Sequence, residues 1–397
     1  MIISKRVSQI SPSPTLAITA KANQMKEQGI KVIGFGAGEP DFDTPNHIKD
    51  AAKKALDAGL TKYTPTSGIK ELKDAISKKF NKDNGLTYSA NEILVSCGAK
   101  HSLFNAILTL ADEGDEVILP SPYWVSYIEM IRMAGAKAVI IKTNQEDQFK
   151  IKPDQLIAAI TSRTKILILN SPSNPTGMIY DKEELLEISK ILIKNNIFCI
   201  SDEIYEKLIY DNIPHVSIAS FNEQIKKCSI VVNGVSKAYA MTGWRIGYAA
   251  GPKEIIGAMS NLQDHSTSNP TSIAQAAAVE ALGGLQEDLK TMVAEFKKRR
   301  EVMVKKVNTI QGLSTLTPQG AFYCFINIKH LLEKSFDGKK IETSMNFADL
   351  LLEKAQVAVV PGSVFGDDHY MRLSYATSMS NITEGLQRIE EFVKKLS

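Results

Sequence analysis

The middle of the chain alternates short apolar runs with amphipathic stretches of helical length. Between residues 91 and 234 the strand-like runs are NEILVSCG, DEVILPSP, KAVIIK, TKILILNSP, IFCISDE and CSIVVNG. Helical stretches such as HSLFNAILTLAD and KEELLEISKILIKNN separate them. Alternation of this kind is typical of an α/β fold with a mainly parallel sheet, and continuously apolar strands indicate that helices cover both faces.

The two ends of the chain have a different texture. From about residue 285 a long charged helix, LKTMVAEFKKRREVMVKKVNTI, leads into GAFYCFINI, FADLLLEKA, VAVVPG and a terminal helix, NITEGLQRIEEFVKKL. This order predicts a smaller α+β domain. We therefore expect an N-terminal arm that belongs partly to the small domain (1–45), a large domain (46–285) and a C-terminal small domain (286–397).

Composition and charge exclude several classes of protein. The 397 residues are 44% hydrophobic and 23% charged, as in ordinary globular proteins. The net charge of +3 comes without a basic tract, which argues against nucleic-acid binding. The N-terminal stretch lacks the apolar segment of a signal peptide, and no run approaches the roughly 20 apolar residues of a membrane span. We expect a cytoplasmic protein.

The cysteines and histidines give no sign of a metal site. Cys97, Cys199, Cys228 and Cys324 are scattered and form no CxxC pair, so we expect buried free thiols in a reducing compartment. The six histidines show no HExxH or related spacing, so we predict that no metal is bound.

Polar residues follow several of the predicted strands, where ligands of parallel sheets bind. A Gly-Ala turn that opens a helix, an amide, a carboxylate with a phenol, and an amine all fall at such positions. These residues are Gly98, Ala99, Lys100, Asn170, Asn174, Asp202, Tyr205, Ser236 and Lys237. Taken singly, each has an ordinary structural explanation as a turn, a helix cap or a solvated side chain. The same holds for Trp124 as a core residue, Tyr63 as a loop anchor, and Arg245 and Arg372 as surface ion pairs.

Taken together, these groups match one chemistry. Lys237 lies in VVNGVSKAYA, among small and apolar neighbours. A buried lysine has a lowered pKa and becomes a nucleophilic amine, which forms a Schiff base with an aldehyde. A buried carboxylate keeps a pyridine nitrogen protonated, so that the ring withdraws electrons. A helix N-terminus with a hydroxyl and an arginine holds a phosphate. The combination predicts a site for pyridoxal 5′-phosphate, held by Lys237.

Six motifs resemble one enzyme family over nearly the whole chain, from about residue 5 onward. They are AGEPDFDTP, KYTPTSGIKEL, SPSNPTG, SDEIYEKLIY, SKAYAMTGWRIGYAAGP and MRLSYATS. They resemble the class-I aminotransferases of fold type I, and within them the bacterial aspartate aminotransferase group that includes aspartate/prephenate enzymes. The resemblance implies a seven-stranded, mainly parallel sheet in a large domain that binds pyridoxal phosphate. It also implies a homodimer with shared active sites.

The resemblance also implies roles for individual residues. Lys237 is expected to form the Schiff base and to move the substrate Cα proton, and Asp202 to pair with the pyridine nitrogen. Asn174 and Tyr205 are expected at the ring oxygen, and Trp124 on the ring face. The phosphate region corresponds to Gly98, Ala99, Lys100, Ser236 and Arg245, with Tyr63 reaching the phosphate of the neighbouring subunit. Arg372 is expected to bind the substrate α-carboxylate with help from the Gly38 backbone, beside Asn174 and Trp124.

Substrate choice depends on fewer residues. The stretch QDHSTSNP contains no arginine for a side-chain carboxylate, and in this group a lysine in the glycine turn takes that role, which Lys100 fits. We expect transfer of the amino group from L-aspartate to 2-oxoglutarate in two half-reactions. Ser11 stands where prephenate-active relatives often carry a lysine, which argues against prephenate but leaves it open.

Three alternative functions remain. The first is an aromatic amino acid or kynurenine aminotransferase, or a lyase, of the same fold. The second is a dinucleotide oxidoreductase, suggested by GFGAG at residues 34–38, but the GxGxxG spacing is missing. The third is a non-enzymatic regulator that reuses the fold. Such regulators carry an added DNA-binding segment, for which we see no room ahead of Ile30.

Overall fold

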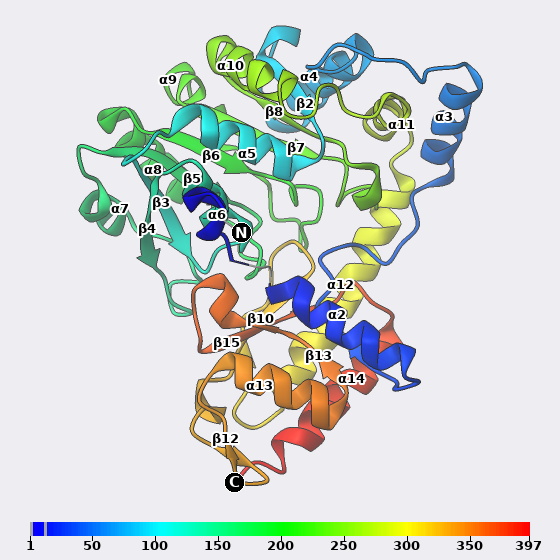
Figure 1. Cartoon of the computed structure of the whole chain (residues 1–397), viewed down its shortest axis with the longest axis vertical. Helices are drawn as coiled ribbons and strands as arrows, with labels where there is room; N and C mark the ends of the chain where they lie inside the picture. The colour runs from blue at the N-terminus through cyan, green and yellow to red at the C-terminus, as the bar shows by residue number, and fades with distance from the viewer. Residues whose placement is uncertain (1–2, 12–13) are drawn as a thin grey trace.

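A seven-stranded sheet forms the centre of the larger half of the molecule (Figure 1). The computed structural model describes residues 3–11 and 14–397. The strand order is β2-β8-β7-β6-β5-β3-β4. The bounds are β2 Ile93–Ser96, β3 Glu116–Ser121, β4 Lys137–Lys142, β5 Thr164–Asn170, β6 Phe198–Asp202, β7 Ser229–Gly234 and β8 Gly247–Ala250. All six strand-like runs of the sequence are strands of this sheet, and its α/β class is as expected.

Strand β8 is the one member of this sheet that no strand-like run predicted. It pairs antiparallel with both β2 and β7, whereas the pairs among β3, β4, β5, β6 and β7 are parallel. The chain turns back between β7 and β8 through residues 235–246, which include Lys237. The reversal therefore places this loop directly beyond the end of β7.

Helices cover both faces of the sheet, which explains why its strands are apolar throughout. In β5, Ile166 and Ile168 pack with one core cluster, and Leu167 and Leu169 pack with another on the opposite face. The first face is covered by α5 (Ala99–Leu110), α6 (Ser126–Met133) and α10 (Lys253–Asp264). The second is covered by α7 (Pro153–Ala159), α8 (Lys182–Asn195) and α9 (Glu223–Lys227). Toward β2 and β8, α3 (Asn46–Asp57), α4 (Lys70–Asn84) and α11 (Ser272–Gly283) form a third cluster.

The C-terminal part is built on a four-stranded antiparallel sheet in the order β14-β15-β10-β9. Its strands are β9 Ser314–Thr315, β10 Tyr323–Asn327, β14 Val360–Pro361 and β15 Tyr370–Ser374. Its helices are α12 (Glu287–Val307), α13 (Ser344–Leu350) and α14 (Met379–Val393), and a two-stranded hairpin is formed by β11 (Ser335–Phe336) and β12 (Lys339–Lys340). Helix α12 extends from the large sheet to this part (Figure 1).

Most of the N-terminal segment packs on the C-terminal part, whereas its first helix, α1 (Lys5–Ser8), contacts α6 of the large domain. The segment also comprises α2 (Pro14–Glu27) and β1 (Ile33–Gly34), and β1 pairs with β13 (Val357–Ala358). Lys21 of α2 forms ion pairs with Asp349 and Glu353. The boundaries at residues 45 and 285 stay a prediction.

Cysteines and helices add two observations. All four cysteines are free; Cys199 and Cys324 are buried, whereas Cys97 and Cys228 are half-buried, which corrects the expectation of burial for these two. No helix in the described ranges combines the length and apolar character that crossing a membrane requires.

Candidate active site

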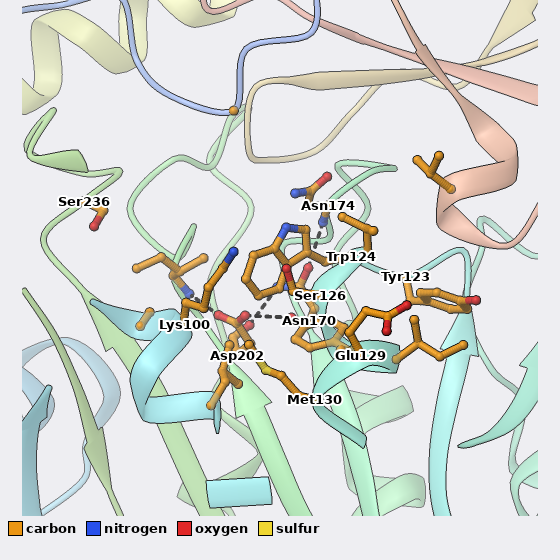
Figure 2. A pocket seen from close by; sticks show the side chains of 18 of the residues that line it. Lys100, Tyr123, Trp124, Ser126, Glu129, Met130, Asn170, Asn174, Asp202 and Ser236 are labelled. Atoms are coloured by element: carbon orange, nitrogen blue, oxygen red, sulfur yellow. Dashed lines mark hydrogen bonds between the residues drawn. The ribbon is translucent and has the colours of Figure 1, made fainter. Parts of the chain in front are cut away.

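A cavity of about 760 Å³ lies where the ends of the β5, β6 and β7 strands face the antiparallel sheet. Figure 2 shows side chains that line it. Of the residues predicted from the sequence, it brings together Gly38, Ala99, Lys100, Trp124, Asn174, Asp202, Tyr205, Ser236, Lys237, Arg245 and Arg372. Gly98 directly precedes this set at the start of α5. Tyr63 does not lie there, since it is 90% exposed.

Lys237 is an amine held among protein groups at the edge of this cavity. Its Nζ donates a hydrogen bond to the Gly38 carbonyl and lies 5.9 Å from the centre of the Phe322 ring. Burial lowers the pKa of Lys237 to about 8, and the positive charges of Arg372 and Arg245 act in the same direction. The neutral, nucleophilic form of this amine is therefore far more populated near neutral pH than in an ordinary lysine.

Asp202 is the buried carboxylate at the end of β6. Its Oδ2 accepts a 2.6 Å hydrogen bond from the Tyr127 hydroxyl, and its Oδ1 accepts one from the Ile204 amide over 3.2 Å. Burial raises the pKa of Asp202 to about 6, and the bond from Tyr127 opposes this rise. Near neutral pH the cavity thus contains a carboxylate that is mostly ionised.

Arg372 enters the cavity from β15 and is 3% exposed. Its Nη1 donates to Asn174 Oδ1 and its Nη2 to the Gly36 carbonyl, both over 2.9 Å. The guanidinium lies 4.3 Å from the centre of the Tyr323 ring. Among the residues that the structure describes, its Nε has no hydrogen-bond partner. Because a guanidinium has five N–H donors, Arg372 retains donors for an anionic ligand.

Two tyrosines form a buried pair under the same cavity. The hydroxyls of Tyr205 and Tyr323 are 2.9 Å apart, and burial raises the pKa of both phenols. Asn170 holds this edge of the sheet by donating to the Asp202 carbonyl over 3.0 Å and accepting from the Asn174 amide over 2.8 Å. A phenol and an amide are therefore fixed next to Asp202.

The N-terminus of α5 meets Arg245 at the other end of the cavity. Gly98 has a φ of +88°, and a Cβ at this position would lie 2.4 Å from Arg245 Nη2. A Cβ on Gly247 would lie 2.0 Å from the Ala99 amide nitrogen. Both glycines thus allow the arginine and the helix start to approach closely. Free N–H groups at a helix start together with an arginine are typical of a phosphate site, and Ser236 adds a hydroxyl.

Lys100 and Trp124 lie together over the cavity (Figure 2). Lys100 Nζ is 5.0 Å from the centre of the Trp124 ring, and the ring meets that of Tyr127 edge-on at 5.2 Å. Burial and the nearby Arg245 charge lower the pKa of Lys100.

Sequence reasoning missed Tyr127, Tyr323 and Glu39, all of which line the cavity. Tyr127 and Tyr323 had no recognisable spacing relative to the strand ends, although Tyr127 ends the stretch SPYWVSY that contains Trp124. Glu39 accepts a 2.7 Å hydrogen bond from Thr242, and its charge opposes the lowering of the Lys237 pKa.

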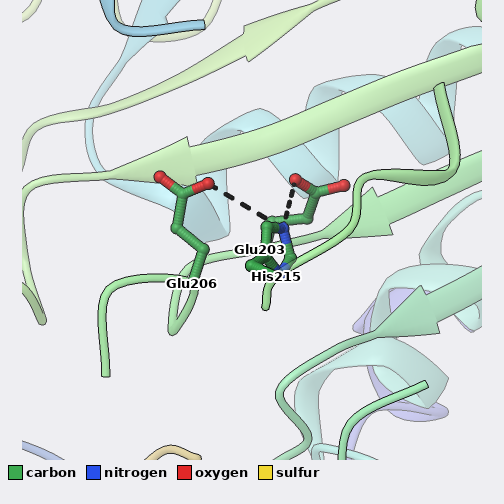
Figure 3. Close-up of side chains that lie close together, drawn as sticks. All are labelled: Glu203, Glu206 and His215. Carbon is green, nitrogen blue, oxygen red and sulfur yellow. Dashed lines mark hydrogen bonds and ion pairs between the residues drawn. The ribbon is translucent and has the colours of Figure 1, made fainter. Parts of the chain in front are cut away.

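Glu203, Glu206 and His215 form a separate buried cluster (Figure 3). Their side chains could each offer one atom to a metal ion, a grouping that their spacing in the sequence did not reveal. The Lys79 ammonium, however, already forms an ion pair with Glu206, and His215 Nε2 lies 2.9 Å from Glu203 Oε2. Because protein cations already neutralise these carboxylates, we assign the cluster a structural role.

The chain belongs to the class I and II aminotransferases. The model of the family described as "Aminotransferase class I and II" matches residues 30–389. The chain is 51% identical over 393 residues to an aspartate aminotransferase of Bacillus sp. (strain YM-2), which covers 99% of both chains. It is 49% identical over 392 residues to an aspartate/prephenate aminotransferase of Nitrosomonas europaea, covering 98% of this chain and 99% of the other. It also superposes on the crystal structure of the aspartate aminotransferase from Rhizobium meliloti with a TM-score of 0.97 and 46% identity, covering 100% of both chains.

Proposed function

We propose that the chain is a pyridoxal phosphate-dependent aspartate aminotransferase. It transfers the amino group of L-aspartate to 2-oxoglutarate, which gives oxaloacetate and L-glutamate. The observation that carries this proposal is the placement of Lys237, with a pKa of about 8, in one cavity with the buried carboxylate of Asp202. The names of the relatives support aspartate as the donor.

The residues of the cavity fit pyridoxal phosphate. Because Gly98 has no side chain, the Arg245 guanidinium lies against the N-terminus of α5, and the two together suit a phosphate. In this proposal Asp202 pairs with the pyridine nitrogen, and Asn174 and Tyr205 bind the ring oxygen. Trp124 offers an aromatic face for stacking. Pyridoxal phosphate, when bound, supplies an aldehyde for the amino group and an electron-withdrawing ring.

The residues of this chain then perform the remaining tasks. Arg372 binds the substrate α-carboxylate with the donors that Asn174 and Gly36 leave free. Lys237 removes the proton from the substrate Cα and would deliver a proton to the cofactor. A positioned base of this kind contributes roughly 10²–10⁴-fold to the rate. The second half-reaction runs through the same groups in reverse with 2-oxoglutarate.

The test combines cofactor labelling with mutation of the lysine. Purified protein supplied with pyridoxal phosphate is reduced with borohydride, and peptide mapping is expected to find the label on Lys237. Lys237→Ala should lose nearly all turnover and still bind the cofactor weakly. Lys237→Arg is the matched control for charge and is expected to be equally inactive. A protein that takes up no pyridoxal phosphate, or Lys237→Ala with near-native turnover, would refute the proposal.

Prephenate and aromatic amino acids are the second candidate substrates, because the relatives include an aspartate/prephenate enzyme. Ser11 lines the cavity, and its amide donates to Glu129 over 3.4 Å. The N-terminal stretch thus borders the space that a larger substrate would fill. Steady-state screening of aspartate, phenylalanine, kynurenine and prephenate with several 2-oxo acids would rank these alternatives.

We infer that the working enzyme is a cytoplasmic homodimer with shared sites. Tyr63 is 90% exposed and lies outside the cavity, so its expected contact with a phosphate requires a second subunit. A mixture of Tyr63→Ala and Lys237→Ala chains tests this, because refolded hybrid dimers contain one site with both native residues. Activity well above either parent is expected; none would contradict shared sites.

A further inference from the structure

Tyr127 donates a hydrogen bond to Asp202, the carboxylate that we expect at the nitrogen of the proposed cofactor ring. We propose that Tyr127 is a positioning residue that keeps the Asp202 carboxylate ionised and fixed in orientation, so that it can pair with the ring nitrogen. This inference rests on the proposed function, because it assumes that pyridoxal phosphate occupies the cavity.

The phenol of Tyr127 is held from two sides. Tyr127 is the second residue of α6, and its side chain is 1% exposed. Its ring packs edge-on against the Trp124 ring at 5.2 Å and 84°. Its hydroxyl reaches Asp202 Oδ2 over 2.6 Å. A single side chain therefore connects the group expected on the ring face to the group expected at the ring nitrogen.

The direction of this hydrogen bond is settled by the charges around it. Burial, followed by the charge of Asp202, raises the pKa of the Tyr127 phenol well above its ordinary value. The phenol therefore keeps its proton and donates it, and the carboxylate accepts. The Ile204 amide donates to the other oxygen, Oδ1. An ionised carboxylate offers about four acceptor positions, so positions remain for a ring N–H.

Four titratable groups face Asp202 in the described part of the chain: Tyr127, Glu203, Tyr205 and Lys237. Burial raises the pKa of Asp202, the Glu203 charge adds to the rise, and Tyr127 and Lys237 oppose it. Removal of the Tyr127 hydroxyl takes away a hydrogen bond to the charged form. The pKa of Asp202 must then rise further, and a protonated carboxyl no longer offers a negative charge to a protonated ring nitrogen.

The experiment measures the dissociation constant of pyridoxal phosphate between pH 5.5 and 8.5 by fluorescence. Tyr127→Phe keeps the ring and its contact with Trp124. If loss of the hydroxyl raises the Asp202 pKa by one, which is a tenfold change in proton affinity, the ionised fraction of Asp202 at pH 5.5 falls about eightfold. Tyr127→Phe is then expected to weaken cofactor binding about eightfold near this pH. The difference should fall toward onefold above pH 8, where Asp202 is ionised in both proteins. Titration of Lys237 affects both proteins and cancels in the ratio.

Two further variants separate positioning from a general structural effect. In an Asp202→Asn background, Tyr127→Phe should change the dissociation constant by less than about twofold, because the partner charge is gone. Tyr88→Phe is the matched control: Tyr88 is 2% exposed, and its hydroxyl has no partner among the described residues. It is expected to bind the cofactor like the wild type at every pH.

The outcomes are distinct. A ratio that does not vary with pH, or an equal loss in the Asp202→Asn background, would overturn the inference and leave the proposed function intact. Wild-type protein that binds no pyridoxal phosphate would overturn the proposed function itself. If Tyr127→Phe does not fold, 3-fluorotyrosine at position 127 replaces it. Its more acidic hydroxyl is a stronger donor and should tighten binding at pH 5.5, and weaker or unchanged binding would refute the inference.

Discussion

Arg372 Nη1 donates a hydrogen bond to Asn174 Oδ1 over 2.9 Å and thereby joins strand β15 to the loop that follows β5. The two residues are 198 positions apart, one in the antiparallel sheet and the other in a loop that follows a strand of the large sheet. The bond holds the guanidinium in one orientation while its Nε remains without a partner in the described structure. The antiparallel sheet thus presents an oriented cation to a cavity built by the parallel sheet.

Arg372→Lys should impair binding of the amino acid more than later steps. Lysine cannot make a two-pronged contact with a carboxylate, and a lost hydrogen bond to a charged group costs about 1.5–3 kcal/mol. We expect KM for aspartate to rise about 10- to 100-fold, with a smaller change in kcat, in steady-state assays. Arg388→Lys is the control, because Arg388 pairs with Glu384 on α14. An unchanged KM for Arg372→Lys would contradict the assignment.

Lys100→Ala should discriminate between substrates. Lys100 lines the cavity beside Trp124, and its lowered pKa reflects burial and the Arg245 charge. If Lys100 pairs with the side-chain carboxylate of aspartate, its removal should reduce kcat/KM for aspartate at least tenfold and change that for phenylalanine little. Lys194→Ala on α8 is the control for loss of a lysine. Equal losses for both substrates would favour a role at the phosphate and an aromatic substrate.

The sequence predicted the parts of this molecule that depend on local pattern. Six of seven strands of the large sheet are continuous apolar runs, and the residues after them gather in one cavity because parallel strands end at one edge. Strand β8 was missed because its four residues, GYAA, are mostly small and have no alternating pattern. Tyr127 and Tyr323 were missed because they reach the site from a helix and from another sheet, through contacts that no spacing encodes.

The buried ion pair of Lys79 and Glu206 was equally invisible in the sequence and should be important for stability. Both side chains are about 5% exposed or less, and Asn84 also donates to Glu206 over 2.9 Å. Although burial raises the pKa of Glu206, the charges of Lys79 and His215 outweigh it and lower the pKa to about 2.

Lys79→Met should therefore remove the ion-pair partner closest to the buried Glu206 carboxylate and leave it with Asn84 and the more distant His215. Loss of one partner of a buried pair costs about 3–5 kcal/mol, which denaturant unfolding at pH 7 would measure. The double variant Lys79→Met/Glu206→Gln should recover part of the loss, because it removes the orphaned charge. A loss below about 1 kcal/mol for the single variant would contradict the importance of this ion pair for stability.

Asp202→Asn should stabilise the cofactor-free protein above pH 7 but not at pH 4. Burial raises the pKa of Asp202 from an ordinary value of 3.8 to about 6, so the folded protein binds a proton more tightly than the unfolded chain does. The stability that this proton gives is fully present below pH 4 and is lost as the pH rises through 6. A difference of about two in pKa corresponds to about 3 kcal/mol, so the variant should gain that much relative to wild type above pH 7 and almost nothing at pH 4.

Asp211→Asn provides a control of opposite sign. Hydrogen bonds from Arg300 and Lys297 lower the pKa of Asp211 to about 2, so its stabilisation is present above pH 4 and is lost as the pH falls toward 2. In urea unfolding from pH 2 to pH 8, the gain from Asp202→Asn should grow between pH 4 and pH 7, whereas the loss from Asp211→Asn should stay constant above pH 4 and shrink only below it. An Asp202→Asn difference that is independent of pH would mean that this carboxylate costs the fold nothing.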